Sequence, residues 1–142
     1  MMIRPWAEFD ADFPIDGNDE DGKAAEFPGR AISGALAEIF RSLGCEVEEP
    51  QHAYEHGWEF NFMSGKGHLW CQIGLIDKWL LVVEPNVPML TDGSASRAAQ
   101  LDILTRLNAA LGQDPRFGEI RWFTGEEVHS GIKGALSPLG EK

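Results

Sequence analysis

The sequence has few cysteines and no long apolar run. Its 142 residues include two cysteines, Cys45 and Cys71, which are too few for a disulfide framework. Each lies in an apolar run typical of a strand, so we expect both to be buried, reduced thiols. No stretch approaches the roughly 18 apolar residues of a membrane-spanning helix, and the N-terminus lacks the apolar run of a signal peptide. We therefore expect a single soluble domain in the cytoplasm.

Basic residues are also scarce. The chain has 12 Lys and Arg against 23 Asp and Glu, a net charge of −11. Most of this imbalance lies in residues 1–60, which hold 14 acidic and 4 basic residues. Such a surface repels phosphate backbones, so we do not expect nucleic acid as a ligand. The charge is consistent either with attraction of a cationic partner or with solubility alone.

Motifs for metal binding are incomplete. Residues 52–56 match the H-x-x-E-H pattern of inverzincin metallopeptidases, which place the two histidines one helical turn apart. Pro50 and Gly57 leave only a few residues between two strands, too few for a stable helix. The acidic turn over residues 16–22 fails the EF-hand calcium pattern in both registers. We therefore expect no metal site.

Signatures of nucleophilic catalysis and of phosphate binding are missing. There is no G-x-S-x-G, no phosphate loop and no G-x-G-x-x-G. His68 and Cys71 are three positions apart, and on a strand an odd separation directs two side chains to opposite faces. Several glutamates could supply paired carboxylates for acid–base chemistry, but solvated strand faces carry such residues routinely. We expect no catalytic residues and no cofactor.

Apolar periodicity predicts an α+β domain. Residues 28–44 and 94–111 carry apolar side chains at helical spacing. Strand-like alternation covers residues 45–48, 58–62, 69–76 and 79–84, and their short connections predict a four-stranded antiparallel meander. A fifth strand is predicted over 119–124. Residues 128, 132 and 136 are spaced like one stripe of a weak C-terminal helix.

These elements predict one domain over residues 1–142. An irregular acidic arm, 1–27, precedes the α+β core, 28–124, and a tail, 125–142. We expect the arm to lie on the domain and both helices to cover one face of the sheet, leaving the other half exposed. The side chains expected to be buried together are Leu36, Ile39, Phe40, Phe60, Ile73, Leu81, Leu104 and Trp122.

The exposed face of this predicted sheet is the candidate binding surface. Strand alternation directs five polar or aromatic side chains away from the apolar positions of their strands. These candidate partner-binding residues are Glu46, Glu48, Glu59, Trp70 and Gln72. A tryptophan near acidic side chains is typical of a protein-binding surface, unless the N-terminal arm covers Trp70.

The order of helix, antiparallel sheet, helix and strand over residues 28–124 resembles the type III secretion chaperone-like folds. The resemblance includes small size and acidity. It implies a homodimer whose outer surface holds an unfolded segment of another protein. Small acidic immunity proteins, which neutralise a toxin, are similar in composition.

We therefore expect a non-enzymatic protein-binding module, chaperone-like or immunity-like, that covers a basic protein partner. The alternative is an enzyme or small-ligand binder with a pocket between the sheet and the N-terminal arm. A flat acidic sheet face favours the binding module. A buried cluster of His52, His56 and carboxylates favours the alternative.

Overall fold

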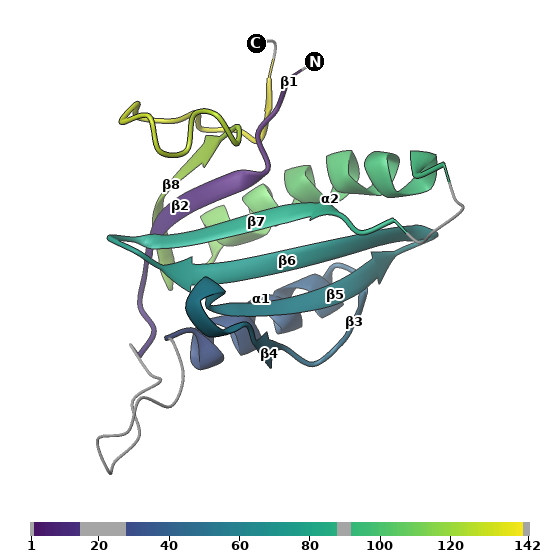
Figure 1. Ribbon diagram of the computed structural model, residues 1–142, viewed down its shortest axis with the longest axis horizontal. Helices are drawn as coiled ribbons and strands as arrows, with labels where there is room; N and C mark the ends of the chain where they lie inside the picture. The colour runs from purple at the N-terminus through teal and green to yellow at the C-terminus, as the bar shows by residue number, and fades with distance from the viewer. Residues whose placement is uncertain (1, 15–27, 88–91, 141–142) are drawn as a thin grey trace.

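Two helices lie against one face of a seven-stranded antiparallel sheet in the computed structural model (Figure 1). The structure describes residues 2–14, 28–87 and 92–140. The predicted α+β class and the placement of both helices on one face are confirmed. The acidic turn predicted over residues 16–22 lies outside the described residues.

Both predicted helices are present. Helix α1, Arg30–Ser42, buries Ile32, Leu36 and Phe40 at helical spacing against the sheet. Helix α2, Ser94–Gln113, begins where Asp92 Oδ1 accepts hydrogen bonds from the Ser94 backbone N–H and hydroxyl, at 3.0 and 2.9 Å. These bonds lower the pKa of the Asp92 carboxyl and satisfy a donor of the first helical turn.

The predicted four-stranded meander forms the larger part of the sheet. Its strands lie side by side in the order β3, β5, β6 and β7. Their bounds are Glu46–Val47, Trp58–Ser64, Gly67–Leu75 and Trp79–Pro85. A further two-residue strand, β4 (Gln51–His52), pairs with the start of β5.

The N-terminal arm was predicted to be irregular, and this prediction is wrong for its first part. Strand β2, Trp6–Ala11, pairs antiparallel with β7 on one side and with β8, Phe117–Phe123, on the other. The fifth predicted strand, β8, therefore lies beside β2 and not beside the meander. The physical reason is the alternation of β2, which turns Ala7 and Phe9 toward the helices, where both are fully buried.

The weak C-terminal helix is also absent from the described residues. Residues 125–138 form turns instead, and Ala135 makes an isolated bridge to Trp122. Gly131 and Gly134 both have a φ of 83°, which an α-helix cannot contain. A short strand β9, Leu139–Gly140, then pairs with β1, Met2–Ile3, and brings the two chain ends together (Figure 1).

The core lies between the helices and the sheet. Seven of the eight side chains predicted to share it are buried, and the eighth, Ile39, is partly buried against it. Phe40 of α1 is central, because its ring stacks on Phe62 at 4.3 Å between centroids and meets Phe60 edge-on at 5.8 Å. These contacts fix helix α1 on strand β5.

We predict that Phe40→Ala and Phe60→Ala each lower the free energy of unfolding by about 3–5 kcal/mol, because each leaves a cavity in this core. Urea unfolding followed by circular dichroism measures the change. The control is Leu136→Ala, whose side chain is 72% exposed and whose loss should cost less than about 0.5 kcal/mol. Parent-like stability of both Phe variants would show that the core faces are wrongly assigned.

Candidate functional site

The sheet face opposite the helices, here called the open face, carries most of the predicted site residues. Antiparallel partners point to the same side, so the register identifies neighbours on this face. Trp70 of β6 lies between Asn61 of β5 and Glu84 of β7. Glu59 faces Gln72, in the row next to Trp70. The structure therefore brings Glu59, Trp70 and Gln72 together.

The other two predicted glutamates lie at the edge of the open face. Glu46 of β3 is opposite Met63 of β5, on the open side. Glu48 follows β3, where its backbone N–H donates to the Asn61 carbonyl at 3.0 Å. Both residues are exposed, and both border the surface around Asn61. Glu84 is an exposed acid directly opposite Trp70. It was not among the predicted site residues, although the alternation of β7 indicates that its side chain points to the open face.

The open face is acidic over strands β3, β5, β6 and β7. Its outward positions there include glutamates but no Lys or Arg. Within the described part of the chain, no Lys or Arg forms an ion pair with Glu46, Glu59 or Glu84. The basic residues of this face lie toward its other side, where Arg121 is opposite Glu8. A cation that approaches Trp70 thus meets uncompensated negative charge.

Strand β2 does not cover Trp70. It lies within the sheet, separated from β6 by β7, so residues 6–11 extend the open face. Trp70 is half-buried by its neighbours. The rest of the predicted arm, residues 15–27, is outside the described residues.

The H-x-x-E-H segment does not form an α-helix, and its two histidines belong to different elements. His52 belongs to strand β4, and its ring lies 5.1 Å from that of Tyr54 and 5.5 Å from that of Trp58. His56 ends a single 3-10 turn, η1 (Tyr54–His56), and lines a different part of the surface. Among the described residues, no group of three His, Cys, Asp or Glu side chains could hold a metal ion.

Both cysteines are free and buried, as predicted. Burial raises the pKa of the Cys45 and Cys71 thiols. Cys71 points into the core, whereas His68 lies on the open side of the same strand, so they form no nucleophile–base pair. Thiolate chemistry is disfavoured at such positions.

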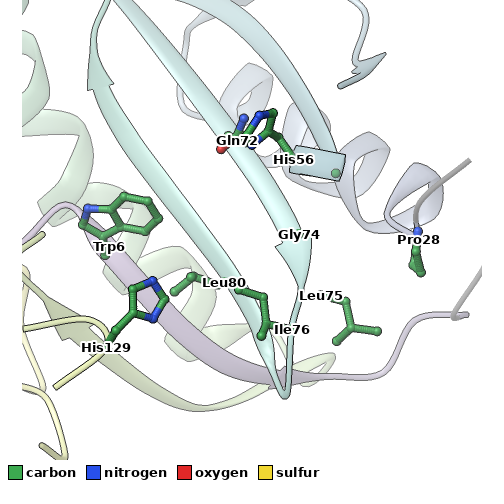
Figure 2. Close-up of a pocket in the computed structure, with 10 residues that line it drawn as sticks. Trp6, Pro28, His56, Gln72, Gly74, Leu75, Ile76, Leu80 and His129 are labelled. Carbon is green, nitrogen blue, oxygen red and sulfur yellow. The ribbon is translucent and has the colours of Figure 1, made fainter. Parts of the chain in front are cut away.

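A cavity of about 200 Å³ lies on the open face between β6, β7, β2 and η1 (Figure 2). Gln72, Gly74 and Leu80 come from the sheet beneath it. Trp6 of β2 and His129 of the C-terminal turns stand at one side, and His56 lines it from η1. The alternative drawn from the sequence placed a pocket between the sheet and the N-terminal arm, whereas β2 of that arm belongs to the sheet and the cavity lies on the open face. Trp6 and His129 were not predicted as lining residues.

Close backbone packing holds η1 beside the cavity. Gly57 has a φ of 90°, and a Cβ there would lie 2.2 Å from the Ile73 carbonyl oxygen. Only glycine allows the chain to pass so near β6. This approach places His56 next to Gly74 at the cavity wall.

On the side of the cavity formed by Trp6 and His129, an ion pair joins the chain before β2 to the C-terminal turns. Arg4 Nε donates to Glu127 Oε1 at 3.0 Å, and the two side chains are 12% and 26% exposed. The same carboxylate accepts the Thr124 backbone N–H at 2.9 Å. Because Arg4 precedes Trp6 and Glu127 precedes His129 by two residues, this pair positions both cavity residues.

Comparisons with known protein families, with curated proteins and with solved structures found no match. No described helix is both long enough and apolar enough to cross a membrane. The geometry of the open face and its cavity therefore carries the functional inference.

We predict that Glu127→Gln lowers the melting temperature near neutral pH, and that the difference from the parent shrinks in acid. Hydrogen bonds from the Thr124 backbone and from Arg4 lower the pKa of the Glu127 carboxyl from its ordinary 4.5. A lowered folded-state pKa stabilises the fold above the unfolded value, and this contribution is lost as pH falls through the folded value.

Thermal melts at steps from about pH 7 to about pH 3 measure this difference. Glu126→Gln is the matched control, because Glu126 is the exposed neighbour in the same turn. A melting difference for Glu127→Gln that stays constant over the whole range would contradict the assigned role of its carboxylate.

Proposed function

We propose that this chain is a protein-binding module, chaperone-like or immunity-like, whose open face covers a basic segment of another protein. The observation that carries the proposal is the position of Trp70, half-buried in the middle of an acidic sheet face with Glu84 directly opposite it. Tryptophan is enriched among the residues that dominate binding energy at protein interfaces.

The chemistry around Trp70 favours arginine and lysine in the partner. A guanidinium or ammonium group over an indole face is attracted by its π-electrons. Glu59, Glu84 and the Asn61 amide lie around that indole and can accept hydrogen bonds from the same cation. Glu46 and Glu48 extend the negative surface along the edge and speed encounter with a basic chain.

The resemblance to type III secretion chaperones supports the same proposal. Those proteins hold an unfolded segment of their partner on an outer surface, and an extended basic segment suits a broad sheet face. The homodimer that this resemblance implies stays a prediction.

We predict that a short, unstructured Arg- and Lys-rich peptide binds at Trp70, whereas its Glu-containing counterpart does not. Titration of ¹⁵N-labelled protein should shift the Trp70 indole N–H resonance, which Trp70→Phe assigns by its disappearance. Trp70→Leu should weaken binding about tenfold or more, because it removes the central aromatic contact. If only the indole resonances of other tryptophans shift, the peptide binds elsewhere on the protein.

We also predict that combined Glu46→Gln, Glu48→Gln and Glu59→Gln slows association of this peptide and flattens its dependence on salt, because screening acts on the removed charges. Stability should be unchanged or slightly higher. The control is combined Glu38→Gln, Asp102→Asn and Glu119→Gln, which removes equal charge from helices α1 and α2 and from the end strand β8, away from the strands around Trp70.

Stopped-flow fluorescence at several salt concentrations measures both variants. Equal slowing of the two would show that net charge alone matters. An unchanged rate and salt slope in the open-face variant would show that its glutamates are only a solvated surface.

A further inference from the structure

The cavity beside Trp6 has features that the protein-binding proposal does not use. We propose that it binds a small, aminated heteroaromatic ring without a phosphate group, of the kind represented by adenine. This inference concerns a different part of the open face from Trp70 and does not depend on a protein partner.

The cavity's size selects one or two fused rings. Its volume is about 200 Å³. Buried cavities of about 150 Å³ hold benzene, and pockets for drug-sized molecules begin at about 300 Å³. A fused bicyclic base lies between these limits.

The cavity's shape and apolar surface suit a flat ring. Gln72 and Trp6 lie on either side of Val82 in one row of the sheet, so their backbones are two strands apart, or about 10 Å. Val82 itself is 2% exposed and does not line the cavity, whose floor is formed by Gly74 and Leu80 in the next row. The Trp6 indole offers a π-surface for stacking, and Leu80 adds apolar contact beneath (Figure 2).

The polar recognition comes from Gln72. Its amide makes no hydrogen bond to another described residue, although it lines the cavity. A carboxamide presents a donor and an acceptor side by side, which match an amino group beside a ring nitrogen. A plain hydrocarbon ring would leave this amide without that pairing, so the amide favours an aminated heterocycle.

The surrounding charge disfavours an anionic ligand. Glu59 is the register neighbour of Gln72 and has no Lys or Arg ion-pair partner among the described residues, whereas Glu8, the register neighbour of Leu80, has Arg121 opposite it. The Glu59 carboxylate would repel a phosphate attached to the ring, in a protein whose net charge is −11. Adenine without a phosphate group, neutral or protonated, avoids this electrostatic repulsion.

The test titrates the full chain with adenine, adenosine monophosphate and indole, following the Trp6 indole N–H by NMR. We expect saturable one-to-one binding of adenine, with weaker binding of the other two. Gln72→Leu should raise the dissociation constant for adenine about tenfold or more, because it removes the paired hydrogen bonds.

Gly74→Val should abolish binding by filling the cavity. A Cβ at Gly74 would lie 3.4 Å from the His56 carbonyl oxygen and would meet no other neighbour more closely, so the fold should accept alanine there. If the valine variant unfolds, Gly74→Ala takes its place, and we expect this smaller side chain to weaken adenine binding less. Leu136→Ala, whose exposed side chain lies outside the cavity, should leave adenine binding unchanged.

Three results would overturn the inference. One is the absence of a saturable Trp6 shift with adenine. Another is binding of indole or adenosine monophosphate at least as tight as that of adenine, which would indicate an apolar or an anion site. The third is an unchanged dissociation constant in both Gln72→Leu and Gly74→Val.

Discussion

Hydrogen bonding of strand β2 on both sides holds the two parts of this molecule together. Its six residues pair with β7, the last strand of the meander, and with β8, which follows helix α2. Without β2, strand β7 would present an unpaired edge and β8 would have no neighbouring strand in the sheet. The same strand carries Trp6 to the cavity, so the fold and the candidate ligand site share one constraint.

The two faces of the sheet carry different side chains because helices cover only one of them. The covered side gathers the large apolar side chains, including Phe9, Phe60 and Trp122, and supplies the hydrophobic stabilisation. The open face is then available for polar and aromatic residues that the core could not accept. Trp70 and the cavity beside Trp6 both lie on this face, at different rows, and Gln72 lies between them.

Sequence periodicity predicted the elements whose partners are close in the chain. The helices around Leu36 and Leu104 and the meander were found because each repeats its apolar positions several times. Glu59, Trp70 and Gln72 were placed on the correct face for the same reason. Strand β2 was missed because its alternation is short, stands among acidic residues and finds its partners far along the chain.

The cavity could be located only roughly for a related reason. Trp6, His56 and His129 come from three segments that are distant in sequence, and each segment alone looks like a strand end or a turn. Their convergence depends on the Arg4–Glu127 pair and on the passage of Gly57 beside β6. Because these residues come together only in the folded chain, no local sequence pattern indicates the cavity.

The position of β2 also determines the order in which the protein can be completed during synthesis. Translation makes β2 before either of its partners, because β7 emerges from the ribosome as the last strand of the meander and β8 only after helix α2. Until then, both edges of β2 are unsatisfied, and closing the intervening loops costs chain entropy before any pairing is gained. The unpaired edges of β2 can pair with other nascent chains, and the negative charges in and after this strand oppose such pairing.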